Sequence, residues 1–145
     1  MLLGQYILPI NDQGQFTLPS NLCAALENHV YLTQGFDRNL LLLTAESFER
    51  IYSYIKNTSM SDPLSRLLVR LFLGSAVELN INDSGEIQIP SGLREYACTE
   101  EKIIMVGQGD YFEIWAPLFW DEQTISLRDY QANVDRFAKF NLATA

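Results

Sequence analysis

The chain has 145 residues, of which 48% are hydrophobic and 19% are charged, and this composition excludes a disordered chain. Its length fits one ordinary domain or two small intertwined halves. The net charge of −8 disfavours non-specific nucleic-acid binding through the field of the whole protein, but it leaves room for a local basic patch. The acidity is uneven: residues 1–73 hold five basic and six acidic side chains, and residues 74–145 hold five and twelve.

The first part of the chain reads as short strands and turns with one short helix. The expected elements are strands at 6–10 and 16–18, a helix opened by Pro19 and reaching residue 26, and strands at 30–33 and 40–43. Asn11-Asp12-Gln13-Gly14 is a cluster of turn-favouring residues, with a glycine available for positive φ. The run of leucine at 40–43 predicts a fully buried strand.

Two helices are expected between residues 44 and 73. Thr44 is a typical N-cap residue, and Asp62-Pro63 is a cap followed by proline at the first helical position. Arg66 and Arg70 are four residues apart and share one helix face. Three interpretations of that face stay open: a solvated surface, ion pairs with the acidic second half of another subunit, or contacts to DNA. The charge asymmetry favours the ion pairs over DNA.

Residues 82–91 repeat residues 11–20. The two segments, Asn-Asp-Ser-Gly-Glu-Ile-Gln-Ile-Pro-Ser and Asn-Asp-Gln-Gly-Gln-Phe-Thr-Leu-Pro-Ser, match at five of ten positions with an offset of 71. The elements expected around the second copy are strands at 77–81, 87–89, 103–106 and 111–115 and a short helix opened by Pro90. Two copies in a chain of this length predict a duplicated half-domain.

A helical segment is expected after Ala116-Pro117. Its apolar side chains, Tyr130 and Phe137 among them, recur at spacings of three and four residues. Such a stripe needs a partner surface. The sequence leaves open whether that surface belongs to the same domain or to a neighbouring subunit.

Several blocks of the chain resemble the MraZ family of bacterial regulators, whose two halves each carry an AbrB-like DNA-binding unit. The family motif is an Asp-x-x-Gly-Arg turn followed by an apolar-x-apolar-Pro strand end. The matching blocks are Gly4 and Tyr6, Asp62-Pro63 with Arg66 and Arg70, Ala76, Asp83, Gly85, Ile89-Pro90, Leu93-Arg94-Glu95-Tyr96-Ala97, and Gly107-x-Gly109-Asp110 leading to Phe112-Glu113-Ile114-Trp115. The last block is specific, and the likeness covers residues 1 to about 120.

The resemblance implies an α+β fold, namely a duplicated AbrB-like swapped-hairpin β-barrel with surrounding helices and a pseudo-twofold axis. The implied division is a first AbrB-like half at 1–50, linking helices at 51–75, a second half at 76–120 and a C-terminal helical tail at 121–145. The implied function is a DNA-binding transcriptional regulator of the bacterial division and cell-wall gene cluster, acting as an oligomeric ring on promoter repeats in the cytoplasm, at the nucleoid.

The chain departs from the family pattern where DNA would be contacted. The family has arginine after each motif glycine, and this chain has Gln15 and Glu86 there. Of the basic residues expected around the two motifs, only Arg94 remains. Glutamine can hydrogen-bond a base edge, whereas glutamate and phosphate are both anionic and repel each other. The alternative function is therefore an oligomeric interaction protein of the same fold with lost or weakened DNA binding.

These considerations define the candidate residues. The expected DNA-binding residues are Asp12, Gln13, Gln15, Arg38, Asp83, Glu86 and Arg94, and the expected oligomer-interface residues are Arg66, Arg70, Tyr130 and Phe137. We expect no catalytic residue, cofactor, metal site, membrane contact or small-molecule substrate.

The polar residues that could suggest an enzyme have simpler interpretations. Asp12 and Asp83 each precede a turn glycine, where aspartate usually caps its own backbone amides, and we expect Asn11 and Asn82 to do the same. His29, the single histidine, has no nucleophile placed beside it in any motif. Cys23 and Cys98 lack the spacing of a zinc or redox pair, and we expect two buried free thiols in a reducing compartment.

Overall fold

The computed structural model describes residues 1–140, and its class is α+β, as the resemblance implies. The strands are β1 (Gln5–Pro9), β2 (Gln15–Thr17), β3 (His29–Gln34), β4 (Leu40–Thr44), β5 (Val77–Asn80), β6 (Glu86–Gln88), β7 (Lys102–Gly107) and β8 (Tyr111–Trp115). The helices are α1 (Ser20–Ala25), α2 (Ala45–Lys56), α3 (Pro63–Phe72), α4 (Ser91–Ala97), α5 (Pro117–Leu127) and α6 (Tyr130–Phe137), followed by the 3-10 turn η1 (Ala138–Phe140).

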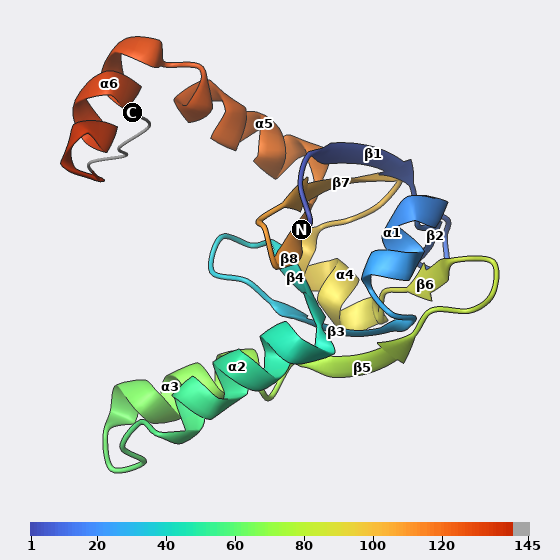
Figure 1. The fold of residues 1–145 in the computed structure, drawn as a ribbon, viewed down its shortest axis with the longest axis horizontal. Helices are drawn as coiled ribbons and strands as arrows, with labels where there is room; N and C mark the ends of the chain where they lie inside the picture. The colour runs from blue at the N-terminus through green and yellow to red at the C-terminus, as the bar shows by residue number, and fades with distance from the viewer. Residues whose placement is uncertain (141–145) are drawn as a thin grey trace.

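Six strands form one antiparallel sheet in the order β1-β7-β8-β4-β3-β5 (Figure 1). β2 and β6 form a separate antiparallel ribbon. The two ends of the sheet are built in the same way. β1 pairs with β7 at one end as β5 pairs with β3 at the other, and β8 and β4 lie between them. Each part of the chain therefore supplies an edge strand to the other, and neither part holds a complete sheet.

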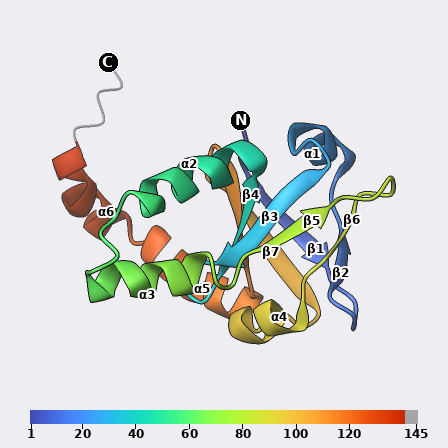
Figure 2. The ribbon, with the colours of Figure 1, turned by 90° about the horizontal axis from the view of Figure 1, so that it is seen from below.

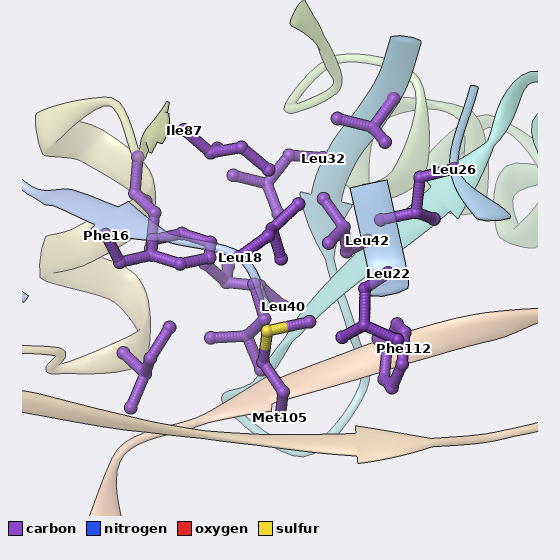
Figure 3. Close-up of a cluster of buried hydrophobic side chains, with 14 of the residues drawn as sticks. Phe16, Leu18, Leu22, Leu26, Leu32, Leu40, Leu42, Ile87, Met105 and Phe112 are labelled. Carbon is purple, nitrogen blue, oxygen red and sulfur yellow. The ribbon is translucent and has the colours of Figure 1, made fainter. Parts of the chain in front are cut away.

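One hydrophobic core lies between the sheet, the ribbon and helices α1 and α4. Figure 3 shows Phe16 of β2 and Ile87 of β6 in one cluster with Met105 and Phe112 from the sheet. Phe16 and Ile87 are directly paired across the ribbon, and both are buried. Since side chains alternate along a strand, the other ribbon residues point outward. This outer face consists of Gln15, Thr17, Glu86 and Gln88.

β4 is buried on both faces, as its leucines predict. Leu40 and Leu42 belong to the main core, and Leu43 belongs to a second cluster with Ile55 of α2 and Phe72 of α3. The α2–α3 pair therefore covers the face of the sheet opposite the main core.

Both helix caps expected between residues 44 and 73 are confirmed. Thr44 Oγ1 accepts a hydrogen bond from Ser47 N–H at 3.1 Å, and Asp62 Oδ1 accepts one from Leu64 N–H at 2.9 Å. Each side chain satisfies a backbone donor that the first turn of a helix leaves without a partner.

The C-terminal helical segment is present but is divided in two. α5 ends at Leu127, and α6 begins at Tyr130 with Asp129 as its N-cap, whose carboxylate accepts a hydrogen bond from Ala132 N–H at 3.1 Å. The single apolar stripe expected along this segment is therefore interrupted. Figures 1 and 2 show α5 and α6 as an arm that leaves the sheet on the same side as the α2–α3 pair. Neither helix contains a buried residue.

Helices lie across two of the expected segment boundaries. α2 spans the boundary at 50/51, and α5 spans the one at 120/121. The division into two halves, linking helices and a tail stays a prediction.

Two isoleucines in neighbouring strands test the assignment of the core. Ile103 of β7 is fully buried, whereas Ile7 of β1 is 69% exposed. Because Ile103→Ala leaves a cavity, we expect it to lower the free energy of unfolding by about 2–5 kcal/mol. Ile7→Ala should change it by about 0.5 kcal/mol or less. The measurement is urea unfolding at one fixed protein concentration, and equal losses in the two variants would contradict this packing.

Candidate nucleic-acid interface

Two turns, at 11–15 and 82–86, lead into the strands of the ribbon. In the first turn, Asn11 Oδ1 accepts hydrogen bonds from the backbone N–H groups of Gln13 and Gln15, at 3.0 and 2.9 Å. The Asn11 side-chain amide also donates to Gln15 Oε1 at 2.9 Å. One asparagine thus holds the shape of the turn, and the Gln15 side chain is tied to it.

The second turn is built in the same way. Asn82 Oδ1 accepts hydrogen bonds from Ser84 N–H and Glu86 N–H, at 3.0 and 2.9 Å. Within residues 1–140, the carboxylates of Asp12 and Asp83 accept no hydrogen bond, and both residues are exposed. The prediction that side chains cap the turn amides is therefore wrong for Asp12 and Asp83 and confirmed for Asn11 and Asn82. The asparagine one residue earlier is better placed to reach the amides at the far end of each turn.

Two glycines join the turns to the ribbon. Gly14 and Gly85 have φ of +80° and +79°, in the left-handed region that favours glycine. The Gly14 carbonyl accepts a hydrogen bond from Ile89 N–H at 2.8 Å, and the Gly85 carbonyl accepts one from Leu18 N–H at 2.9 Å. Because the ribbon is antiparallel, the two turns lie at its opposite ends and flank its outer face.

Arg94 of α4 packs against the first turn. Its Nη1 donates to the Asp12 carbonyl at 3.0 Å, and among the described residues its buried Nε has no partner. A Cβ at Gly14 would lie 2.5 Å from the Arg94 side chain, so this close approach also requires glycine. The guanidinium is half-buried and is engaged with the backbone of its own chain.

Cys23 of α1 occupies the corresponding place at the second turn, at the repeat offset from Arg94. A Cβ at Gly85 would lie 3.1 Å from Cys23 Sγ. Cysteine supplies no cation, so nothing at this position offsets the carboxylates of Asp83 and Glu86. The ribbon and its turns carry three carboxylates, those of Asp12, Asp83 and Glu86, and Arg94 of α4 brings one guanidinium to the first turn.

Gln88 is a residue that sequence reasoning missed. Its Nε2 donates to the Gln13 carbonyl at 2.9 Å, which links β6 to the first turn. The sequence could have predicted it, because Gln88 follows Glu86 by two residues in one strand and so lies on the same outer face of the ribbon.

The structure does not bring Arg38 to the turns. Arg38 lies in the β3–β4 connection, and its Nη2 is 3.3 Å from Cys98 Sγ while its guanidinium lies over the Phe119 ring, at 4.9 Å. The start of β3 pairs with β5, which leads into the second turn, and the connection is at the other end of β3. Arg38 Nη2 is also 3.5 Å from the Tyr96 carbonyl of α4, and among the described residues Arg38 makes no hydrogen bond or ion pair with either turn.

The four expected interface residues lie on the α2–α3 pair and on the α5–α6 arm, which together form the helical projections of the molecule. Arg66 Nη1 donates to two carbonyls of the α2–α3 connection, at 3.1 and 3.2 Å. Arg70 is exposed and forms no ion pair within residues 1–140. Tyr130 and Phe137 of α6 are 77% and 44% exposed. In Figure 2 these helices and the ribbon lie on opposite sides of the sheet.

The most perturbed carboxyl group lies away from the ribbon, on β8. Burial raises the pKa of Glu113, and the nearby Asp37 carboxylate raises it further, while a hydrogen bond donated by the Asn39 side chain acts in the opposite direction. Burial, with Glu113 and Asp110 as secondary causes, also raises the pKa of Tyr111.

No metal cluster or membrane-spanning helix is found in the part of the chain that the structure describes. Residues 1–140 contain no group of three potential metal ligands, and none of their helices is both long and apolar enough to cross a bilayer. His29 contacts Glu78 Oε1 and Asn80 Oδ1 on the adjacent strand, at 3.0 and 3.1 Å. Both cysteines are free thiols, but Cys98 is exposed and Cys23 is half-buried, so the prediction that both are buried is wrong.

Comparison with known proteins shows the family. A Thermoanaerobacter pseudethanolicus protein named "Transcriptional regulator MraZ" is 34% identical over 122 residues, which cover 84% of this chain and 85% of the relative. The chain belongs to the MraZ family. A protein of the same name from Caldanaerobacter subterraneus subsp. tengcongensis is 30% identical over 141 residues, or 94% of this chain and 99% of the relative. The family model described as "MraZ protein, putative antitoxin-like" matches residues 72–140.

The spacing of the MraZ motif agrees with the turn geometry. Counting three residues back from Gly14 and Gly85 leads to Asn11 and Asn82, so the motif aspartate corresponds to these asparagines, and Asp83 is not its counterpart.

The turn geometry of this MraZ-family protein can be tested with two adjacent residues. Asn82→Ala removes the acceptor of two backbone hydrogen bonds, so we expect a loss of about 1–2 kcal/mol in the free energy of unfolding. Asp83→Ala removes none and should change it by about 0.5 kcal/mol or less. Urea unfolding of both variants measures the difference, and a larger loss for Asp83→Ala would assign the cap to the aspartate.

The Glu113 carboxyl predicts a pH effect on stability. Its pKa is raised above the ordinary value of 4.5, so the folded chain binds more protons than the unfolded chain just above that value. Stability contributed by this group is therefore present below pH 4.5 and is lost as pH rises through the raised pKa. Glu113→Gln, which keeps an acceptor for Asn39, should raise the thermal midpoint at pH 7 but not at pH 4. The exposed control Glu122→Gln should show no such difference, and an equal gain at both pH values would contradict the prediction.

Proposed function

We propose that this chain is a DNA-binding transcriptional regulator that acts as a homo-oligomeric ring, on promoter repeats of a bacterial division and cell-wall gene cluster, in the cytoplasm and at the nucleoid. The relatives named "Transcriptional regulator MraZ" support the class of function. The observation that carries the proposal for DNA is the β2–β6 ribbon, whose exposed polar face is flanked by two matched turns.

The duplication of an AbrB-like unit is part of the same proposal. We infer that residues 1–50 and 76–120 are AbrB-like halves with swapped hairpins around a pseudo-twofold axis. The exchanged pairing of β1 with β7 and β5 with β3 supports this, as do the equivalent Asn-to-backbone bonds of the two turns.

The shape of the ribbon suits duplex DNA. The major groove of B-DNA is about 12 Å wide and admits a two-stranded β-ribbon. Gln13, Gln15 and Gln88 offer amide groups that can hydrogen-bond base edges, and Asp12 and Asp83 mark the turn at either end. In this proposal the turns and the outer face contact DNA, Arg94 holds the first turn in position, and Arg38 lies outside the interface.

A second candidate function is favoured by the charges on the ribbon. Three carboxylates face one guanidinium that is already bound to a backbone carbonyl, and phosphate contacts require cations. The second candidate is an oligomeric interaction protein of the same fold that has lost or weakened DNA binding.

Binding to a duplex from the promoter of its own gene decides between the two functions. Affinity at low salt that falls steeply as salt is added supports the regulator. No binding at low salt, with the oligomer intact by light scattering, overturns it and supports the interaction protein.

A double substitution tests whether the outer face can reach DNA. Gln15 and Glu86 lie diagonally across the ribbon, about 7–8 Å apart. Gln15→Arg with Glu86→Arg should give or strengthen duplex binding, with the slope of log K against log salt steeper by about 2 for each subunit that contacts DNA. The control, Gln5→Arg with Glu122→Arg, makes the same charge change at exposed sites off the ribbon. An inert but folded ribbon variant would show that this face does not reach DNA.

A further inference from the structure

An open groove of about 470 Å³ lies beside the α2–α3 pair, and this volume is within the range of small-molecule sites. Its lining is mostly apolar and includes four aromatic residues, Phe36, Tyr54, Phe72 and Tyr111. Tyr54 is 75% exposed and Phe36 is 71% exposed, so their rings border the open side of the groove. None of the four residues expected at the oligomer interface lines it.

Two acidic residues line the same groove, Asp37 of the β3–β4 connection and Glu113 of β8. The buried Asn39 side chain connects them. Its amide donates a hydrogen bond to the Glu113 carboxylate, and its Oδ1 accepts one from the Asp37 backbone N–H at 3.2 Å. The Glu113 carboxylate and the backbone that carries Asp37 are therefore held in place by the protein itself.

These two carboxylates lack a positive partner. Neither forms an ion pair within residues 1–140, and no Lys, Arg or His of that part of the chain lines the groove. Arg38 follows Asp37 directly, but its guanidinium lies over the Phe119 ring, at 4.9 Å. Burial raises the pKa of Glu113 and the Asp37 carboxylate raises it further, whereas a bound cation would act in the opposite direction.

The acidic and aromatic parts of the lining favour the same kind of ligand. A carboxylate forms charge-assisted hydrogen bonds with an ammonium group, and an aromatic face attracts a cation through its quadrupole. Leu41, directly opposite Glu113 in the neighbouring strand, and Leu68 of α3 offer contacts to a hydrocarbon body. A metal ion would use the carboxylates but would leave the apolar lining unfilled.

We propose that this groove binds a small organic cation, a protonated amine with an apolar body, whose ammonium group lies at the carboxylates of Asp37 and Glu113. The body of the ligand packs on Leu41, Tyr54 and Leu68. The groove and the ribbon are on opposite sides of the sheet, so a ligand here does not cover the outer face of the ribbon (Figure 2). The inference goes beyond the proposed function and does not rest on DNA binding.

A matched set of probes tests the proposal at pH 7, by titration in ligand-observed saturation-transfer NMR. We expect 2-phenylethylammonium to bind with a dissociation constant of about 1 mM or tighter, which is within reach of a ligand of this size. Its neutral isostere, 2-phenylethanol, should bind at least about tenfold more weakly, because it brings no charge to the carboxylates. Methylammonium has the charge without the body and should also bind at least about tenfold more weakly.

Charge variants locate the ammonium group. Glu113→Gln keeps an acceptor for Asn39, and Asp37→Asn keeps the size of its side chain. Each variant should weaken 2-phenylethylammonium at least about fivefold and change 2-phenylethanol by about twofold or less. The control, Glu122→Gln, removes the same charge from an exposed site on α5 outside the groove and should change neither probe.

A second pair of variants locates the apolar body. Tyr54→Ala removes a ring from the lining and should weaken both probes, with circular dichroism as the check of folding. Tyr52→Ala makes the same change on the same helix at a residue that does not line the groove, and it should weaken neither.

The contrary outcomes are distinguishable. Equal affinity for the ammonium and the alcohol would overturn the role of the carboxylates. Equal losses in Glu113→Gln and Glu122→Gln would mean general attraction to a chain of net charge −8 and would overturn the site. Absence of ammonium binding would also overturn it, and a lower particle mass for Tyr54→Asp in sedimentation would then assign the groove to a second copy of the chain. Duplex binding by the ribbon is measured separately and is not decided by any of these results.

Discussion

The structure depends on a reciprocal pair of backbone hydrogen bonds. Gly14 accepts from Ile89, and Gly85 accepts from Leu18, at the two ends of the β2–β6 ribbon. Both glycines have positive φ, so a side chain at either position would strain the turn. The two bonds extend the β2–β6 ladder at its ends, and between them Phe16 and Ile87 pair and pack into the main core. The local conformation of two glycines thus fixes the ends of the ribbon that covers one side of the main core.

The same arrangement separates two surfaces. The ribbon and its turns lie on one side of the sheet, and the α2–α3 pair and the α5–α6 arm lie on the other (Figures 1 and 2). The ribbon is polar and carries mostly negative charge, whereas the helical projections expose apolar stripes. In the proposed function the first surface contacts DNA, and the second carries the residues expected at the oligomer interface. Assembly would place several weak ribbons on one particle, and avidity then compensates for the low affinity of each.

The turns show how a family's geometry can persist while its chemistry changes. The shape of each turn comes from Asn11 or Asn82 and from a glycine, and it needs no arginine. The residue after the glycine points outward from the ribbon, so Gln15 and Glu86 alter the charge of the surface and leave the turn intact. Membership of the MraZ family therefore accounts for the scaffold, while binding to DNA is decided by the side chains on its outer face.

Local patterns in the sequence were sufficient for most of the secondary structure. The repeat located the strands and turns, the leucine run at 40–43 predicted a strand buried on both faces, and Thr44 and Asp62 marked two helix starts, because periodicity and caps act within a few residues. Only the tertiary structure decided which residues meet. Arg94 is turned toward a backbone carbonyl of the first turn, and Arg38 contacts α4, Cys98 and the Phe119 ring, since strand exchange sets the distances between residues far apart in the sequence. The sequence predicts an apolar face on α6, but only the tertiary structure shows that this face is exposed within the chain, because periodicity does not say what covers a helix.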